Sequence, residues 1–494
     1  MAGKLPALSS AEVTARGPLP DPCAPSPREA CGVFGVYAPG EQVSHLAYFG
    51  LFALQHRGQE SAGIAASDGR TLTVFKDMGL VAQVFDETSL AGLEGGHLAI
   101  GHTRYSTTGS NRWENAQPVH RQAGLTSVAL AHNGNLTNTR QLAAELGVGG
   151  ATTDSDLMLE AIARRIDDER ADGRGLEKAM LEALPTFEGA FSLAVMDQGR
   201  LVAVRDPHGF RPLSLGRLAG GGWVVASETA ALDILGAAFV RDVEPGEMVV
   251  IDAGGLRSLR PFPAAEPRLC IFEFVYFARP DSQLYGRNVF AARRRMGGIL
   301  ADEHPAAADV VVPVPESGIP AAEGFSERSG IPYVDGLVKN RYVGRTFIEP
   351  TQMLRDRGIR LKLNPIPDTF RGRSVVLVDD SIVRGSTTRQ LVTMVREAGA
   401  REVHLRISSP PYRWPCFYGM DTSDQSTLIA ARMSVDEVCA SVGADSLGYL
   451  SLEGLLEACG TGAAGFCTAC LSGDYPTRVD DQAGKFVLEP TATG

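Results

Sequence analysis

The sequence lacks long apolar runs, an excess of positive charge and a dense set of cysteines. None of its apolar stretches approaches the ~18 residues that a membrane-spanning helix needs, and no apolar signal-peptide core follows the early lysine. A cytoplasmic protein with no membrane partner is therefore expected. The 47 basic and 58 acidic residues leave a net charge of −11, which is not typical of nucleic-acid binding.

The length of the chain predicts more than one domain. A chain of 494 residues exceeds one ordinary hydrophobic core, so two domains of about 200 residues or more are expected. Residues 1–30 are rich in proline, alanine and serine and predict a disordered leader, because this composition buries too little apolar surface. The pattern then predicts a first domain over 31–260, a second over 261–477 and a tail over 478–494.

Short apolar segments dominate the first domain. A helix over residues 45–56 is predicted to place Leu46, Phe49 and Ala53 on one face. A hairpin is predicted at 190–204, where two apolar runs flank the turn D-Q-G. Strands with interposed helices are typical of a layered α+β domain.

Strands and helices alternate from about residue 270. D-V-V-V-P-V-P-E-S-G and S-V-V-L-V-D-D each read as a buried strand that runs into a polar loop. A helix with Leu391, Val395 and Ala398 at helical spacing follows and is predicted to stop at Gly399. This alternation predicts an α/β domain with a mainly parallel sheet, in which ligands bind at the carboxyl ends of the strands.

Cys31 opens the first predicted strand, a position where a lone cysteine is commonly just a small buried residue. Three loop motifs make a chemical role more specific. Arg104 offers a planar guanidinium for a carboxylate, Asp154 offers a carboxylate for an amine, and Asn133 with the Gly134 amide offers an oxyanion hole. Arg104 or Asp154 alone would be an ordinary surface ion pair. The whole set suits glutamine.

The ordered motifs C-G-V-F-G, Q-H-R-G-Q-E-S-A-G, H-T-R-Y-S-T-T-G, H-N-G-N-L and D-P-H-G-F-R-P-L resemble the glutaminase domain of the N-terminal-nucleophile amidotransferases, which has αββα layers. The resemblance implies that the leader is a propeptide and that Cys31 becomes the first residue, with its freed α-amine as the base. An α-amine titrates near ~7.7–8.0 and a thiol near ~8.5, so this proton transfer costs little. The implied glutamine-binding residues are Arg104, Thr107 and Asp154, and the implied oxyanion hole is Asn133 and Gly134.

Two adjacent carboxylates, Asp379 and Asp380, end a predicted strand, and a hydroxyl-rich loop leads from them into a helix. Helix N-termini favour phosphate, and paired aspartates can accept hydrogen bonds from a diol or approach a magnesium-bound substrate. A single aspartate there would commonly be a helix cap. The segment V-V-L-V-D-D-S-I-V-R-G-S-T-T resembles the phosphoribosyl pyrophosphate signature of type I phosphoribosyltransferases. The resemblance implies that Mg²⁺ lies near Ser317, Asp379 and Asp380, and that the substrate is bound by Asp379, Asp380, Ser381, Arg384, Gly385, Ser386, Thr387 and Thr388.

A basic segment, K-N-R-Y-V-G-R-T-F-I over 339–348, could be an ordinary solvated surface. By the resemblance it is a mobile lid that excludes water, with Lys339, Arg341 and Tyr342 on the substrate and Arg345 nearby.

Four of the eight cysteines stand in contexts that match an iron–sulfur branch of the same family. C-T-A-C is a thiolate pair at metal spacing, which is only moderately specific alone. The resemblance implies a structural [4Fe–4S] cluster on Cys270, Cys416, Cys467 and Cys470. A zinc site and buried thiols without metal are the alternatives, and nothing bars Cys439 or Cys459 from replacing a ligand.

The union of the two halves resembles the amidophosphoribosyltransferase family from residue 31 to about 477. The resemblance implies that glutamine, phosphoribosyl pyrophosphate and water give phosphoribosylamine, glutamate and pyrophosphate, in the first committed step of purine synthesis. It also implies a homotetramer inhibited by purine nucleotides. A glutaminase that aminates a sugar phosphate is one rival, which the 375–388 loop argues against. A regulator that only senses phosphoribosyl pyrophosphate is another, but it would need a basic nucleic-acid module, which this acidic chain does not offer.

Overall fold

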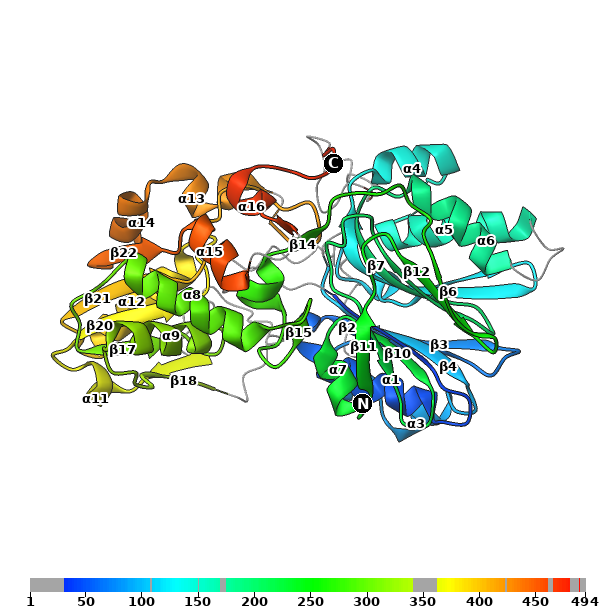
Figure 1. The fold of residues 1–494 in the computed structure, drawn as a ribbon, viewed down its shortest axis with the longest axis horizontal. Helices are drawn as coiled ribbons and strands as arrows, with labels where there is room; N and C mark the ends of the chain where they lie inside the picture. Colours follow the sequence, from blue (N-terminus) through cyan, green and yellow to red (C-terminus); the bar gives the residue numbers. More distant parts are fainter. Residues whose placement is uncertain are drawn as a thin grey trace, which may run out of the picture.

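A computed structural model of the chain describes residues 31–106, 109–149, 151–168, 175–340, 362–422, 424–460, 465–479 and 488. It has two lobes, one built around two large antiparallel sheets and the other around a parallel sheet (Figure 1). No helix within the described ranges is both long enough and apolar enough to cross a membrane.

The first lobe stacks two sheets in which every neighbouring pair of strands is antiparallel. One sheet contains, in spatial order, β11 (Ala238–Asp242), β9 (Ser214–Arg217), β10 (Trp223–Ala226), β1 (Gly32–Tyr37), β4 (Leu98–Arg104), β2 (Ser61–Ser67) and β3 (Leu72–Met78). The other contains β13 (Gly255–Leu259), β12 (Met248–Asp252), β8 (Leu201–Arg205), β7 (Gly189–Met196), β6 (Thr126–Leu136) and β5 (Val119–Ala123). The predicted hairpin at 190–204 is the β7–β8 pair.

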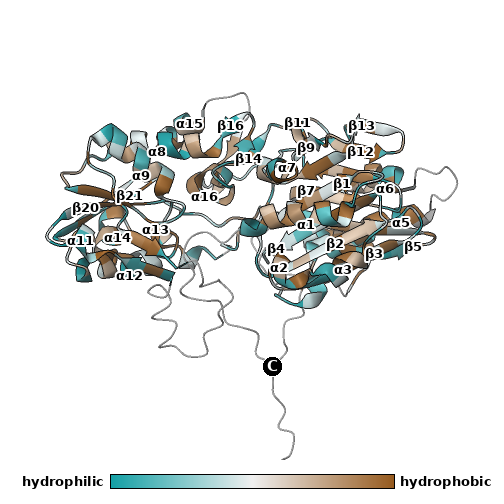
Figure 2. Ribbon diagram, turned by 90° about the horizontal axis from the view of Figure 1, so that it is seen from below, coloured by the Kyte–Doolittle hydropathy of each residue, from teal (hydrophilic) through white to brown (hydrophobic). Residues whose placement is uncertain are grey.

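Helices cover the outer face of each sheet. Successive side chains of a strand point to opposite faces, so Val33 packs between the sheets while Phe34 packs under the helices. The helices on the first sheet are α1 (Val43–Ala53), α2 (Val81–Val84), α3 (Glu87–Ala91) and α7 (Thr229–Ile234). Those on the second sheet are α4 (Thr139–Leu146), α5 (Asp154–Asp168) and α6 (Gly175–Ala183). The four layers are the predicted αββα arrangement. In Figure 2 brown, apolar ribbon appears on strands of both lobes and on parts of the helices that cover them.

The helix predicted over 45–56 is α1, which is followed by a 3₁₀ turn at Gln55–Arg57. Of the three residues expected on one face, Ala53 is buried and Leu46 packs against the core, but Phe49 is not. Phe49 is 47% exposed, whereas Ala47 and Leu51 are fully buried. The reason is Gly50, where an added Cβ would lie 2.3 Å from the ring of Phe34. Because small residues allow this close approach, α1 packs through its Ala47 and Gly50 side and turns Phe49 outward.

The second lobe contains four parallel strands in the order β17 (Val310–Pro313), β20 (Ser374–Asp379), β21 (Glu402–Ile407) and β22 (Ser446–Tyr449). Helices α8 (Val289–Glu303) and α9 (Ile319–Ser329) pack on one face, and α12 (Ser386–Glu397) and α14 (Val435–Val442) on the other. The predicted helix with Leu391 and Val395 inward is α12, and Gly399 follows its end with φ +102°.

Smaller elements complete this lobe. Its two-stranded pairs are β14 (Arg268–Cys270) with β23 (Gly465–Cys467), β15 (Gln283–Leu284) with β16 (Arg287–Asn288), and β18 (Leu337–Lys339) with β19 (Leu363–Pro365). Its short helices are α11 (Pro367–Phe370), α13 (Ile429–Arg432), α15 (Leu452–Cys459), α16 (Ala469–Ser472) and the π-helical turn Glu273–Phe277.

Candidate active sites

Cys31 lies directly before β1 and is only 7% exposed. Its Sγ lies 3.3 Å from the carbonyl oxygen of Tyr105, and the Tyr105 N–H donates to Sγ at 3.5 Å. Burial raises the pKa of this thiol, while the Tyr105 contact and the charge of Arg104 act in the opposite direction. The thiol therefore needs a nearby base to ionise readily at neutral pH.

Arg104 and Asp154 both lie close enough to Cys31 for their charges to act on its thiol. Arg104 ends β4 and is 3% exposed, and Asp154 begins α5 and is 5% exposed. The Leu136 N–H donates to Asp154 Oδ2 at 3.1 Å, which fixes the carboxylate beside β6. A guanidinium and a carboxylate thus flank the thiol, as an α-amino acid substrate requires. Thr107 lies outside the described residues.

Asn133 and Gly134 lie on β6. Asn133 is 1% exposed, and neither its Nδ2 nor its Oδ1 has a hydrogen-bond partner among the described residues. An unpaired buried amide costs free energy, so such a group commonly serves a ligand. At Gly134 an added Cβ would lie 2.0 Å from the Ala190 carbonyl oxygen, so no larger residue fits there.

Glu60 was not among the predicted site residues, although it stands in the motif Q-H-R-G-Q-E-S. Its Oε2 accepts a hydrogen bond from the Ser106 N–H at 2.8 Å and lies 3.8 Å from Arg104 Nη1. Glu60 therefore fixes the turn that follows Arg104. Its charge also acts on the Cys31 thiol.

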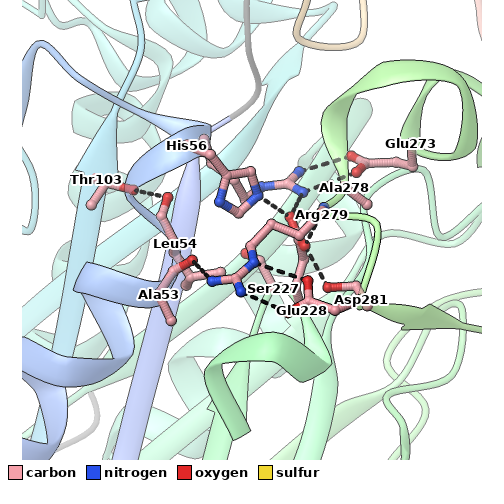
Figure 3. A network of polar contacts seen from close by, with 12 residues as sticks. Ala53, Leu54, His56, Thr103, Ser227, Glu228, Glu273, Ala278, Arg279 and Asp281 are labelled. Carbon is pink, nitrogen blue, oxygen red and sulfur yellow. Dashed lines mark hydrogen bonds and ion pairs between the residues drawn. The ribbon is translucent and has the colours of Figure 1, made fainter. Parts of the chain in front are cut away.

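Arg57 connects Cys31 to a buried ion network that the sequence did not predict. Figure 3 shows part of this network around Glu228 and Glu273. Its Nε donates to the carbonyl oxygen of Cys31 at 3.0 Å. Its terminal nitrogens donate to Glu228 at 2.6 Å and to both oxygens of Glu273 at 2.9 and 2.8 Å. Arg211 Nη1 donates to Glu273 at 3.1 Å, and all four side chains are fully buried. Because removal of one partner from a buried pair typically destabilises by about 3–5 kcal/mol, these groups are held firmly.

Glu228 and Glu273 come from different lobes. Glu228 precedes α7 in the first lobe, and its Oε2 accepts from the Arg279 N–H at 2.9 Å and the Ser282 hydroxyl at 2.6 Å in the second. Burial favours its neutral form, but His56 and Arg57 outweigh burial and hold the pKa of Glu228 well below its usual range. The network therefore joins the two lobes through ionised groups.

Asp379 ends β20, and Asp380 follows it, so both stand at the carboxyl edge of the parallel sheet. Asp380 is fully buried and accepts hydrogen bonds from the hydroxyls of Ser317 and Ser381. Burial, and then the charge of Asp380, raise the pKa of Asp379 well above its usual value. Two buried carboxyls in contact favour a bound cation or hydrogen-bond donor between them.

The loop after these carboxylates begins α12. Gly385 has φ +77°, and a Cβ there would lie 2.5 Å from Ile429 Cδ1, so glycine is required. Thr388 is 4% exposed, and the buried Oγ1 of Thr387 has no partner among the described residues. Ser386 and Arg384 are half-buried beside them. A helix N-terminus with hydroxyl groups is suited to a phosphate.

Only the start of the predicted lid is described. Lys339 ends β18, and its Nζ lies 3.2 Å from Glu316 in the P-V-P-E-S-G loop. Arg341, Tyr342 and Arg345 lie outside the described residues, so the lid stays a prediction.

The four predicted cluster ligands come together from separate segments. Cys270 of β14 is in register with Cys467 of β23, and the N–H groups of Arg413 and Trp414, just before Cys416, donate to the Cys470 carbonyl at 3.1 and 3.0 Å. All four thiols are buried. Burial raises the pKa of Cys270 to about 11, with Cys416 among the neighbours that add to it. Among the described residues, no group of three or more His, Cys, Asp or Glu side chains is placed to hold a metal ion.

The two remaining described cysteines have other surroundings. The Cys439 thiol donates to the Ala444 carbonyl at 3.3 Å at the end of α14. Cys459 ends α15, where Arg287 contacts its carbonyl oxygen.

Comparison with known proteins connects these sites to one enzyme family. The profile of the glutamine amidotransferase domain matches residues 102–234. The amidophosphoribosyltransferase of Mycobacterium tuberculosis (strain CDC 1551 / Oshkosh) is 55% identical over 493 residues, which cover 96% of this chain and 92% of that protein. The chain belongs to the amidophosphoribosyltransferase family. Its relative from Bacillus subtilis is 47% identical, over 91% of this chain and 95% of that protein.

Solved structures of this family have the same two lobes. One, described as the allosteric regulatory enzyme of purine biosynthesis, has a TM-score of 0.86 at 45% identity and covers 94% of this chain and 100% of its own. Another, the B. subtilis glutamine phosphoribosylpyrophosphate amidotransferase complexed with ADP and GMP, has a TM-score of 0.85 at 45% identity and covers 92% of this chain and 100% of its own. The lobes are therefore an N-terminal-nucleophile glutaminase and a phosphoribosyltransferase, and the chain is an amidophosphoribosyltransferase of purine biosynthesis.

Proposed function

We propose that Cys31 is the nucleophile that releases ammonia from glutamine. After removal of residues 1–30, the thiol proton moves to the α-amine of Cys31, and the thiolate attacks the side-chain carbonyl of glutamine. Ammonia leaves, and water hydrolyses the thioester to give glutamate. Arg104 and Asp154 hold the α-carboxylate and α-amine of glutamine. The unpaired buried amide of Asn133 carries this assignment, because with Gly134 it supplies donors for the oxyanion.

Loss of the Asn133 amide should affect chemistry more than stability. We expect Asn133→Ala to lower the glutamine-dependent kcat by about 10²-fold, because one oxyanion donor typically contributes that much. Ammonia-dependent synthesis should be unchanged. Asn138→Ala is the matched control, since Asn138 Nδ2 donates to the Thr186 carbonyl at 2.9 Å in the same lobe but away from the thiol. Equal losses of kcat in both variants would contradict the oxyanion role.

The ammonia then attacks C1 of the ribose of phosphoribosyl pyrophosphate, and pyrophosphate leaves. Asp379 and Asp380 bind the ribose hydroxyls, and the Gly385–Thr388 loop binds the 5′-phosphate. The oxygen groups of Ser317, Asp379 and Asp380 fit Mg²⁺, which prefers such ligands together with substrate phosphates. Mg²⁺, when bound, would neutralise charge on the pyrophosphate. Lys339 stands beside the Glu316 loop, where it can approach the same charge.

The four buried thiols of Cys270, Cys416, Cys467 and Cys470 would hold a structural [4Fe–4S] cluster, in which each thiolate binds a different iron. The Tyr418 N–H donates to Cys416 Sγ at 3.4 Å, a contact that would stabilise a ligating thiolate. The cluster would have a structural role, because the reaction moves no electrons. Asn135 Nδ2 donates to the Phe417 carbonyl at 3.0 Å, so the Cys416 segment also braces the strand of the oxyanion hole.

Iron should therefore be essential to the stability of the fold. Anaerobically purified protein should be brown and contain about four iron and four sulfide per chain, as a [4Fe–4S] cluster requires. Cys467→Ser should lose iron and unfold at lower temperature. Cys459→Ser, a matched change of another buried cysteine, should keep its iron. Stoichiometric zinc without iron would contradict the cluster.

A homotetramer in the cytoplasm, inhibited by purine nucleotides, completes the proposal. The B. subtilis relative was solved with ADP and GMP, which supports nucleotide binding in this family. Light scattering and inhibition assays with both nucleotides test these points.

A further inference from the structure

The π-helical turn Glu273–Phe277 contacts Arg57 on its first-lobe side and is held by Arg293, which lies in the field of Asp380, on the other. π-helical turns are rare and occur frequently at functional sites. On the first-lobe side, Glu273 holds Arg57 through two hydrogen bonds, and Arg57 holds the carbonyl of Cys31. Figure 3 shows Glu273 and Glu228 in the same polar network. A single residue, Arg57, therefore links the turn to Cys31 through hydrogen bonds.

On the other side of the turn, Arg293 of α8 holds its main chain. Arg293 Nε donates to the Phe274 carbonyl at 2.7 Å, and Nη2 donates to the Ala278 carbonyl at 2.9 Å. This guanidinium is 3% exposed. Burial lowers the pKa of Arg293 to about 10, and the charge of Asp380 is the strongest influence opposing that effect. A cation fixed to the turn thus lies within electrostatic range of the phosphoribosyl site.

We propose that Glu273 and Arg293 are positioning residues that connect the two sites, with Arg293 sensing the acceptor near Asp380 and Glu273 orienting Cys31 through Arg57. The inference rests on the proposed roles of Cys31 and Asp380. Binding of Mg²⁺ and the anionic substrate beside Asp380 would change the field on Arg293, and the arginine would transmit any shift to the turn through the carbonyls of Phe274 and Ala278. Coupling of this kind requires that the acceptor bind one arrangement of the turn better than another. Ammonia would then be released when an acceptor is present.

The first test replaces Glu273 with glutamine, which keeps the shape and removes the charge. We expect the glutamine-dependent kcat to fall by about tenfold or more with KM for glutamine within about twofold, because Arg104 and Asp154, not Arg57, hold the substrate. Ammonia-dependent synthesis should stay near the wild-type rate. Glu247→Gln is the matched control, because Glu247 is a 1% exposed carboxylate that accepts two 2.7 Å bonds from Arg241 elsewhere in the first lobe. A similar fall in kcat for Glu247→Gln, or a rise in KM alone for Glu273→Gln, would overturn the proposal.

The second test measures glutamine hydrolysis with and without Mg²⁺–phosphoribosyl pyrophosphate. Arg293→Lys keeps the positive charge but cannot hold both carbonyls. We expect the acceptor to stimulate glutamine hydrolysis by the wild-type enzyme. The ratio of the rates with and without acceptor should be at least about fivefold smaller in the variant, which is within the usual range of coupling between sites. Ammonia-dependent synthesis should change by less than about twofold, since Arg293 is not placed on the substrate. Unchanged stimulation, or a parallel loss of ammonia-dependent synthesis, would overturn the proposal. If Glu273→Gln does not fold, Arg293→Lys decides alone. A wrong assignment of Cys31 or Asp380 would be detected separately, because variants of those two residues would then keep the activities that the proposed function assigns to them.

Discussion

Cys31→Ala is expected to abolish glutamine-dependent synthesis while ammonia-dependent synthesis remains. Loss of the nucleophile removes the covalent route completely, so we expect a fall of at least about 10³-fold in the glutamine-dependent kcat. The phosphoribosyl site lies in the other lobe and can use free ammonia without the Cys31 thiol. The measurement is phosphoribosylamine formation with each nitrogen source, at a pH where enough ammonia is unprotonated.

The control separates chemistry from maturation. Intact-mass measurement of wild-type protein should show residues 1–30 removed, because the α-amine of Cys31 is the proposed base. Cys459→Ala, which changes another buried thiol, should keep both activities. A fully active enzyme that retains the leader, or a Cys31→Ala variant that still uses glutamine, would contradict the assignment.

The sequence predicted the layers and most polar groups because both have local signatures. The layered α+β first lobe followed from short apolar strands, its αββα order from the resemblance, and the parallel sheet from strand–loop–helix alternation. Asp379 and Asp380 stand at a strand end in a motif whose chemistry is visible without coordinates. Cys31, Arg104 and Asp154 were expected together from the chemistry of their motifs and from the resemblance, although 123 positions separate the first from the last. The structure brings them within electrostatic range.

What the sequence did not reveal depends on contacts between distant segments. The outward turn of Phe49 depends on Gly50 meeting Phe34, which helical periodicity alone does not encode. The Arg57–Glu273 pair joins residues 216 positions apart. One signal did exist: Glu273 is a lone carboxylate within the apolar run C-I-F-E-F-V-Y-F, and a charge in such a run predicts a buried partner without identifying it.

Asp379→Asn or Asp380→Asn is expected to abolish phosphoribosyl transfer from either nitrogen source. Both carboxyls lie at the end of β20, and Asp380 is fully buried where Ser317 and Ser381 donate to it. In the proposed site, an amide in either place would not supply the negative charge that binds Mg²⁺ and accepts hydrogen bonds from the ribose hydroxyls. We expect kcat to fall by about 10³-fold, the upper range for loss of one preorganised electrostatic group. Phosphoribosylamine formation should be measured with glutamine and with ammonia.

The other end of the same strand offers the control for this prediction. Asp309 Oδ2 accepts a hydrogen bond from the Ser374 N–H at 2.8 Å, at the start of β20 and away from the carboxyl edge. Asp309→Asn should therefore leave both activities near wild type. The Asp379 and Asp380 variants should keep their basal glutaminase activity, because Cys31 lies in the other lobe.

Equal loss of basal glutaminase and phosphoribosyl transfer would show that these variants fail to fold. Retention of ammonia-dependent synthesis would show that the two carboxylates are not in the phosphoribosyl site.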